Sequence, residues 1–163
     1  MLALPDRIPD RLRPDVRAVS VALCHGCFDV IHFGHVNHLE VASTLADRLV
    51  VSITDDAYVT KPGRPVFSAA ERARVLAALS FVDHVVVVSA PDAMPILEAL
   101  RPDVFVKGSD YLGPVRDERR AAQFRAERDL VVAYGGRVVH TEEDTFSSSQ
   151  VVDRLLGGAR QTT

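Results

Sequence analysis

The chain has 163 residues, 47% of them hydrophobic, and its 19 basic and 22 acidic residues leave a net charge of −3. This size allows one domain with a substantial core, and the charge excludes a protein that attracts nucleic acid or anionic membranes through its overall field. No apolar stretch approaches the roughly 20 residues that cross a bilayer, and residues 1–17 lack the apolar centre of a signal peptide. We therefore expect a cytoplasmic protein without nucleic-acid or membrane partners.

Short β-branched segments alternate with longer helical ones, which is typical of a parallel sheet with helices on both faces. The expected strands are 19–23, 49–53, 85–88, 104–106 and 137–140. The expected helices are 36–45, 69–79, 94–100, 117–134 and 148–156. This order predicts an α/β fold, a single Rossmann-like domain with a five-stranded parallel sheet flanked by helices.

The expected domain covers residues 18–157. An N-terminal arm at 1–17, either extended or a short helix packed outside the sheet, precedes it, and a flexible tail at 158–163 follows. Ligands of open parallel sheets bind outside the carboxyl ends of the strands. The loops that follow the expected strands are therefore the places to look for a site.

The segment from Gly26 to His35 joins the first expected strand to the first expected helix. A glycine-marked turn at this place leaves backbone N–H groups at the helix N-terminus, which favours bound phosphate. His32 and His35 flank Gly34, so two imidazoles can converge with those donors on one anion. The segment indicates chemistry on a nucleotide phosphate.

Cys24 and Cys27 are the only cysteines, and they have the C-x-x-C spacing of redox and zinc sites. A structural zinc site needs two further ligands, which His25, His32, His35 and His38 could supply. A metal or redox module therefore stays open as an alternative, as does a nucleotide-binding module without catalytic activity.

The only two lysines, Lys61 and Lys107, both follow expected strands, on the same side of the sheet as the His-Gly-His turn. A lysine ammonium is a compact, mobile charge that can follow phosphate oxygens. Lys61 lies in a polar, proline-rich loop at 54–65, and loops of this length in compact domains tend to bind ligands. Gly108 permits close approach of a ligand to the backbone, and Asp110 could bind an acceptor hydroxyl or hold a lysine.

Three consecutive serines, Ser147, Ser148 and Ser149, precede the last expected helix. An N-cap explains one of them, whereas three hydroxyls at the positive end of a helix dipole suit phosphate. They predict a second phosphate-binding segment, although serine runs also occur in ordinary linkers.

These segments together resemble the cytidylyltransferase-like nucleotidyltransferases, from Ser20 to Leu156. The stretch from Gly26 to His35 matches the family signature G-x-F-D-x-x-H-x-G-H, and the three serines match its S-T-T-type motif with both threonines replaced. The segment 106–111 is similar to the V-K-G-x-D-Y segment of the heptose 1-phosphate adenylyltransferase branch. The segment 141–144 lacks the arginine that the glycerol 3-phosphate cytidylyltransferase branch carries there, so the heptose branch is favoured.

The resemblance implies transfer of a nucleoside monophosphate from ATP or CTP to a phosphorylated sugar, with in-line attack and release of pyrophosphate. A heptose 1-phosphate-like acceptor is expected, and a polyol phosphate or phosphonate is the alternative. The resemblance also implies Mg²⁺ bridging the phosphates, without an assigned protein ligand, and a homodimer.

The residues to which the resemblance assigns roles fall into three groups. The expected catalytic residues are His32, His35, Lys61 and Arg72. The expected nucleotide-binding residues are Gly26, Cys27, Phe28, Asp29, Gly34, His35, Ser147, Ser148 and Ser149. The expected acceptor-binding residues are Asp55, Lys107, Gly108 and Asp110.

Overall fold

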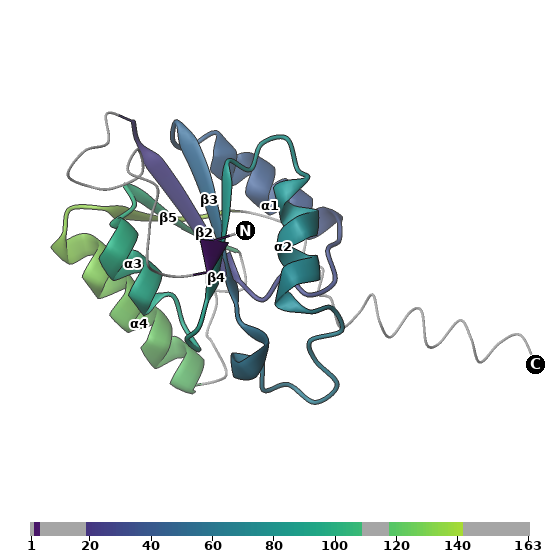
Figure 1. Cartoon of the computed structure of the whole chain (residues 1–163). Coiled ribbons are helices and arrows are strands. Elements are labelled where there is room, and N and C mark those ends of the chain that lie inside the picture. The colour runs from purple at the N-terminus through teal and green to yellow at the C-terminus, as the bar shows by residue number, and fades with distance from the viewer. Residues whose placement is uncertain (1, 4–18, 109–117, 142–163) are drawn as a thin grey trace, which may run out of the picture.

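The computed structural model describes residues 2–3, 19–108 and 118–141. Within these residues a six-stranded sheet has the strand order β1-β4-β3-β2-β5-β6, and every pairing is parallel (Figure 1). The strands are β1 (Leu2–Ala3), β2 (Val21–Gly26), β3 (Arg48–Thr54), β4 (His84–Val88), β5 (Val104–Lys107) and β6 (Arg137–His140). The five longer strands confirm the expected sheet. The two-residue β1 adds an edge strand from the arm that was expected to pack outside it.

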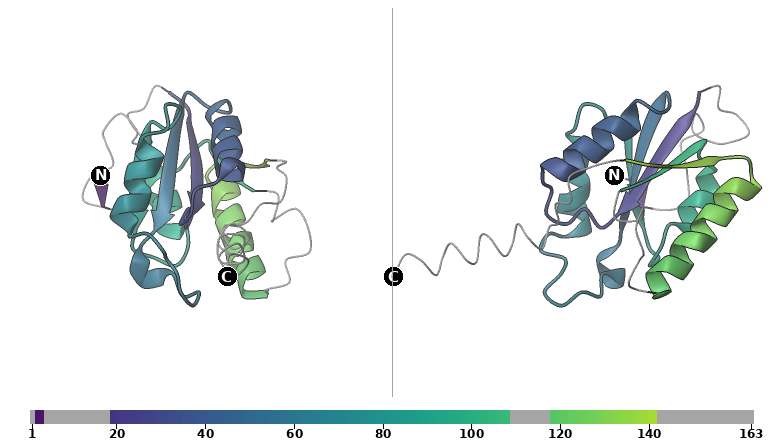
Figure 2. Two further views of the ribbon diagram at one scale, coloured as in Figure 1. Left: turned by 90° about the vertical axis from the view of Figure 1, so that its right-hand side faces the viewer. Right: turned by 180° about the vertical axis from the view of Figure 1, so that it is seen from behind.

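Two helices cover each face of the sheet. They are α1 (Phe33–Ser43), α2 (Ala69–Ala77), α3 (Met94–Leu100) and α4 (Glu118–Ala133), with a short 3-10 helix η2 (Asp56–Tyr58) after β3. Figure 1 shows α1 and α2 on one side of the sheet and α3 and α4 on the other, and the right-hand view of Figure 2 shows β6 beside α4. This arrangement confirms the Rossmann-like α/β fold.

Side chains of β2 alternate between the two halves of the core, as the period of a strand requires. Ala22 and Cys24 belong to the cluster under α1 and α2, with Leu39 and Leu76. Leu23 belongs to the cluster under α3 and α4, which also holds Leu97, Leu100 and Val131. The central strand is therefore buried on both faces.

The strand order reverses between β2 and β5, because the chain runs outward through β3 and β4 and then returns to β5 on the other side of β2. Such a switch point is where open parallel sheets bind ligands, outside the carboxyl ends of the strands. Gly26 ends β2 and Lys107 ends β5 at this place.

The observed boundaries differ from the expected ones mainly around the signature segment. β2 runs on to Gly26 because His25 and Gly26 pair with Ser52 and Ile53 of β3. Cys24 is the last residue of β2 that also pairs with β5. α1 begins at Phe33 and not at residue 36. The turn between the two elements is therefore only six residues long (27–32), and Gly34 and His35 belong to the helix.

Local signals at two helix ends are confirmed. Ser68 and Glu71 form the capping box at α2, and Gly135 follows α4 with a φ of 89°. In the part of the chain that the structure describes, no helix has the length and apolar character needed to span a bilayer. Most of the arm, the helix expected at 148–156 and the tail at 158–163 lie outside the described residues.

Candidate active site

The signature turn is built around a close contact between Gly26 and the ring of Phe28. A Cβ on Gly26 would lie 3.1 Å from a ring carbon of Phe28, closer than side chains normally pack. Phe28 has a φ of 47°, which turns the chain sharply, and its ring is buried. Glycine at position 26 therefore lets the chain leave β2 and fold directly into α1.

The imidazoles of His32 and His35 stack on one another at the start of α1. Their ring centroids lie 3.8 Å apart with an angle of 25° between the planes, and Phe28 meets His35 edge to face at 5.3 Å. His32 is the N-cap residue, its side chain makes no capping hydrogen bond, and the first turn of α1 contains no acidic residue. The positive end of the helix and both rings thus lie together after the carboxyl end of β2, without a carboxylate in that first turn, an arrangement that suits an anion.

Asp29 anchors the loop that precedes α2. Its carboxylate, 5% exposed, accepts hydrogen bonds from the backbone N–H groups of Val66 (2.8 Å) and Phe67 (3.0 Å), and Arg64 Nη1 donates to it at 2.6 Å. Burial raises the pKa of this carboxyl, but the three donors outweigh that effect and hold the pKa below its usual range. Both carboxylate oxygens of Asp29 already accept hydrogen bonds from this loop. Direct contact between Asp29 and a nucleotide stays a prediction.

Arg72 is buried and joins three segments of the site. Its Nε donates to Phe67 O (3.0 Å), Nη1 to Cys27 O, and Nη2 to Thr54 O (2.9 Å). Nη2 also lies 2.6 Å from Asp56 Oδ1. These contacts engage all three nitrogens of the guanidinium group, so phosphate binding by Arg72 stays a prediction and the structure adds a positioning role for it.

The two aspartates after β3 hold the next loop in shape. Asp55 caps η2, since its Oδ1 accepts from Ala57 N at 3.1 Å. Asp56 binds Arg72 through one oxygen and Ala69 N, at the start of α2, through the other at 3.0 Å. The acceptor-binding role of Asp55 stays a prediction. The sequence did not predict the role of Asp56, because Asp55 and Asp56 are adjacent and both follow an expected strand.

Lys107 lies inside the protein, in an ion pair. Its Nζ is 2.8 Å from Glu127 Oε2 of α4, and both side chains are buried. Glu127 Oε1 accepts from Ala93 N, at the start of α3, at 3.0 Å, and the ammonium lies 4.6 Å from the centroid of the Phe105 ring. Sequence reasoning missed Glu127, which looks like one more polar residue in the middle of a charged helix.

His25 and Ser52 lie on the same face of the sheet as this ion pair. His25 Nδ1 is 2.8 Å from Ser52 Oγ, and His25 Nε2 is 3.5 Å from Thr54 Oγ1. Burial, reinforced by the positive charge of Lys107 and partly offset by Glu127, lowers the pKa of His25 from 6.5 to about 4. His25 is therefore a neutral hydrogen-bonding group at physiological pH. The sequence had suggested it only as a metal ligand.

Thr141 joins three elements beside this cluster. Its backbone N–H donates to Lys107 O at 3.0 Å, and its hydroxyl is 2.7 Å from Nδ1 of the buried His38 on α1. Thr141 is thus fixed beside the carboxyl end of β5. The predicted residues Asp110, Ser147, Ser148 and Ser149 lie outside the described residues, while Gly108 follows β5 and is half-buried.

The two cysteines have unreactive surroundings. Cys24 is fully buried in the core and Cys27 is half-buried, and both are free thiols. Burial raises the pKa of the Cys27 thiol, and the nearby Arg72 guanidinium offsets this only in part, so Cys27 is protonated at neutral pH. Within residues 2–3, 19–108 and 118–141, no group of three His, Cys, Asp or Glu side chains is placed to hold a metal ion.

The chain matches a family model described as cytidylyltransferase-like over residues 23–154. Among curated proteins it is similar to the bifunctional protein HldE of Syntrophotalea carbinolica, with 38% identity over 86% of this chain, and to that of Pseudomonas fluorescens, with 43% identity over 83%. The chain spans only 28% of the length of these relatives.

Two solved structures share the fold. A lipopolysaccharide core biosynthesis protein from Thermoplasma volcanium has a TM-score of 0.59 at 23% identity, over 80% of this chain and 100% of that one. A pantothenate synthetase from Thermus thermophilus has a TM-score of 0.60 at 15% identity, over 93% of this chain and 67% of that one. At these identities both likenesses concern the fold alone.

Proposed function

We propose that this chain, which belongs to the cytidylyltransferase-like family and is thereby a nucleotidyltransferase, transfers a nucleoside monophosphate from ATP or CTP to a sugar phosphate. The favoured acceptor is similar to a heptose 1-phosphate. An acceptor phosphate oxygen attacks the α-phosphorus in line, a new P–O bond forms, and the bond to the leaving pyrophosphate breaks. No covalent enzyme intermediate is needed, so positioning and charge stabilisation supply the catalysis.

The observation that carries this proposal is the stacked pair of His32 and His35 at the N-terminus of α1. The helix begins after the six-residue turn that follows the central strand, at the point where the strand order reverses. Imidazole nitrogens and backbone N–H groups therefore lie close together at this helix end. In the proposed reaction they donate hydrogen bonds to triphosphate oxygens as negative charge moves toward the leaving pyrophosphate.

The remaining residues take their proposed roles from where they lie. Lys61, in the exposed loop between η2 and α2, neutralises phosphate charge. Arg72 holds the loops of the site in position, because its guanidinium donates hydrogen bonds to Thr54, Asp56 and Phe67. The serines at 147–149 bind the β- and γ-phosphates in this proposal.

Magnesium is proposed to arrive with the nucleotide. Among the residues that the structure describes, the carboxylates of Asp29 and Asp56 each bind a backbone N–H group and an arginine. They do not form a ready ligand set for the ion, which in nucleotide sites is held largely by phosphate oxygens and water. The proposal therefore assigns charge stabilisation during the transfer to the side chains and backbone N–H groups named above.

The acceptor assignment rests on the segment 106–111 and on Lys107. The Glu127 carboxylate balances the charge of Lys107. Lys107 therefore does not present an uncompensated positive charge to a phosphate. We infer that the acceptor meets this part of the site through hydroxyl groups, while the His-Gly-His turn receives its phosphate end.

A substrate panel tests the function. The protein is incubated with ATP, CTP, GTP or UTP and with heptose 1-phosphate, glycerol 3-phosphate or a phosphonate, and released pyrophosphate is measured with Mg²⁺ and with EDTA. The proposal expects release only when a triphosphate and a sugar phosphate are both present, and strongest release with ATP or CTP.

The other outcomes separate the alternatives. Turnover with glycerol 3-phosphate or the phosphonate, and none with the sugar phosphate, would move the acceptor to the polyol phosphate or phosphonate class. Nucleotide binding without pyrophosphate release from any pair would favour the non-catalytic module. Full activity in EDTA would remove Mg²⁺ from the proposal.

A further inference from the structure

The loop that carries Lys61 is fastened to the signature turn at its far end. Asp29, in the turn, accepts hydrogen bonds from the backbone N–H groups of Val66 and Phe67, and Arg64 Nη1 lies 2.6 Å from its Oδ2. Both members of this ion pair are nearly buried, with 10% of the Arg64 side chain and 5% of the Asp29 side chain exposed. The contact joins residues 35 positions apart in sequence.

A tight turn links Arg64 to Lys61. Arg64 N donates to Lys61 O at 3.0 Å, Pro62 holds the second position, and Gly63 holds the third with a φ of 71°. This is the form of a type II turn, in which proline fixes one angle and glycine supplies the positive one. The first and fourth Cα atoms of such a turn lie within about 7 Å of one another, so fixing Arg64 also fixes the backbone of Lys61.

A second attachment acts on the same stretch. Arg72 donates from Nε to Phe67 O and from Nη1 to Cys27 O, so its guanidinium joins the base of the loop to the start of the signature turn. The loop end at 64–67 and the turn at 27–29 are thus connected through two separate side chains. This end of the polar, proline-rich loop is therefore fixed to the signature turn.

We propose that Arg64 and Asp29 are positioning residues that hold Lys61 at the His-Gly-His turn. The proposal rests on the proposed function, which gives Lys61 its phosphate. Without the Arg64–Asp29 contact, the 61–64 turn stays closed but is no longer oriented by the signature segment. Lys61 then has to be ordered when the nucleotide binds, which costs part of the proximity on which transfer depends.

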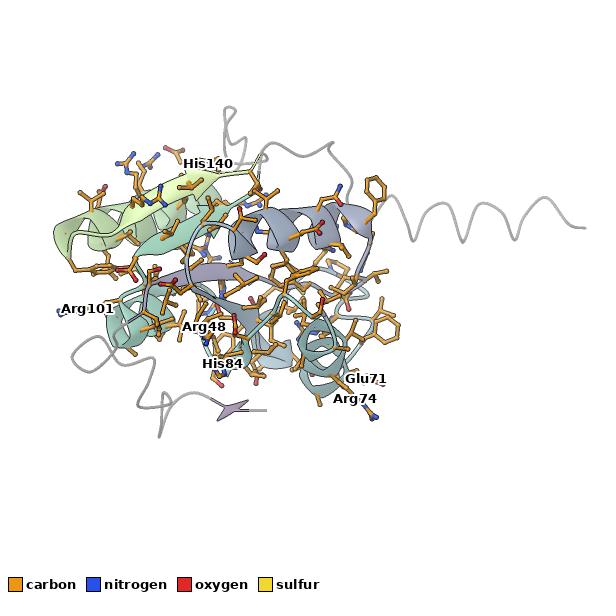
Figure 3. The ribbon with its side chains drawn as sticks, turned by 90° about the horizontal axis from the view of Figure 1, so that it is seen from above. Arg48, Glu71, Arg74, His84, Arg101 and His140 are labelled. Atoms are coloured by element: carbon orange, nitrogen blue, oxygen red, sulfur yellow. The ribbon has the colours of Figure 1, made fainter. Side chains whose placement is uncertain are left out.

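The test compares Arg64→Ala, Lys61→Ala and the double variant, with Arg74→Ala as the matched control. Arg74 is an exposed arginine on α2, and Figure 3 shows it pointing away from the body of the protein. Pyrophosphate release gives kcat and KM, and amide hydrogen exchange of the free protein reports the order of residues 60–67 without reference to activity.

We expect Arg64→Ala to lower kcat by about 10-fold to 100-fold, and the double variant to be no slower than Lys61→Ala alone. Exchange at 60–67 should rise in Arg64→Ala, while exchange in α2 and the kcat of Arg74→Ala stay at the level of the parent protein. Asp29→Asn, which keeps an acceptor oxygen for Val66 N but loses the charge, should reproduce the Arg64→Ala result in both readouts.

Two results would overturn the proposal. Unchanged exchange at 60–67 in Arg64→Ala would show that the ion pair does not order the loop, whatever the activity. Losses in kcat that multiply in the double variant would show that Arg64 acts on the substrate independently of Lys61. A parent protein that releases no pyrophosphate with any substrate pair would overturn the proposed function itself, and the exchange data would then describe only the fastening of the loop.

Discussion

Lys107 Nζ lies 2.8 Å from Glu127 Oε2, and only 4% and 1% of the two side chains are exposed. Burial by itself raises the pKa of the Glu127 carboxyl, yet the Lys107 charge and the hydrogen bonds from Lys107 and Ala93 bring the pKa below its usual range. The carboxylate is thus charged because the ammonium is beside it. Each charge makes the burial of the other tolerable.

Removing one charge of this pair should destabilise the protein strongly. Glu127→Gln keeps the shape and an acceptor for Ala93 N, but it removes the negative charge that lies 2.8 Å from the buried Lys107 ammonium. We expect a loss of about 3 to 5 kcal/mol in the free energy of unfolding, measured by urea titration at pH 7 with the slope of the transition checked for constancy.

The neighbouring pair Arg128–Asp129 provides the control, because its side chains are 49% and 67% exposed at a similar distance of 2.8 Å. Asp129→Asn should cost less than about 1 kcal/mol. Lys107→Met combined with Glu127→Leu should lose less than Glu127→Gln alone. A Glu127→Gln protein as stable as the parent would contradict a stabilising role of this buried ion pair.

The pKa of His25 makes stability depend on pH in a defined window. The native pKa is about 4 and the ordinary value is 6.5. Between pH 4 and pH 6.5, His25 is therefore protonated in the unfolded chain and neutral in the folded protein. Stability from this residue is present above pH 6.5 and declines as the pH falls toward 4. One pKa unit corresponds to about 1.4 kcal/mol, so the whole decline is on the order of 3 kcal/mol.

His25→Gln isolates this contribution. Glutamine can still hydrogen-bond Ser52 but does not titrate, so the difference in unfolding free energy between parent and variant should shrink between pH 7 and pH 4.5. Asp29 also loses stabilisation in acid, but it does so in both proteins and cancels in the difference. Glu127 interacts electrostatically with His25, so the measured difference includes this coupling. An imidazole signal of His25 that titrates near pH 6.5 by NMR would contradict the prediction.

The sequence identified those parts of the site that depend on short-range order. The signature turn could be recognised because Gly26, His32 and His35 occupy fixed places in one continuous segment between a strand and a helix. The capping box of Ser68 and Glu71 spans four residues and is equally local. The five longer strands were recognised from their β-branched runs, although their ends moved wherever a polar residue continued a central strand.

The partners of the charged side chains could not be read in the same way. Asp29 meets Phe67 across 38 positions and Arg72 meets Cys27 across 45, and both contacts depend on how the loops stack at the sheet edge. Glu127 lies on the buried side of α4, together with Val131, and the sequence of this charged helix does not mark that side. A charged residue in a sequence gives no sign of whether its counter-charge is a substrate or another side chain, so Arg72 and Lys107 were assigned to ligands alone.

The capping box at α2 should contribute measurably to stability. Ser68 Oγ accepts from Glu71 N, and Glu71 Oε2 accepts from Ser68 N at 2.8 Å. Ser68→Ala removes the first of these contacts and should lower the free energy of unfolding by about 1 kcal/mol.

Ser43→Ala is the matched substitution, since Ser43 Oγ donates only to Glu40 O in the last turn of α1. It should change stability by less than about 0.5 kcal/mol. Equal effects of the two substitutions in urea titrations would mean that Ser68 does not act as a cap.

Removing one histidine of the stacked pair should abolish most of the proposed activity without unfolding the protein. His35→Ala takes away a ring that contacts both His32 and Phe28 at the start of α1. Loss of one preorganised donor to a transition state commonly lowers turnover by about 10²-fold to 10³-fold. We expect a drop of that order in the kcat for pyrophosphate release, with a smaller change in the Kd for the triphosphate, because the donor acts most strongly as charge develops on the leaving group.

His84→Ala is the control, because His84 begins β4 at the amino ends of the parallel strands, whereas His35 lies in α1, which follows the carboxyl end of β2. It should leave kcat unchanged, and thermal unfolding should show that both variants are folded. If His35→Ala kept the turnover of the parent protein, the stacked pair would be a structural feature of the turn. Catalysis would then have to be assigned to Lys61 and the helix N-terminus. If kcat stayed constant and only the Kd rose, His35 would bind the ground state and the transition state equally, and the proposed role in stabilising the leaving pyrophosphate would be wrong.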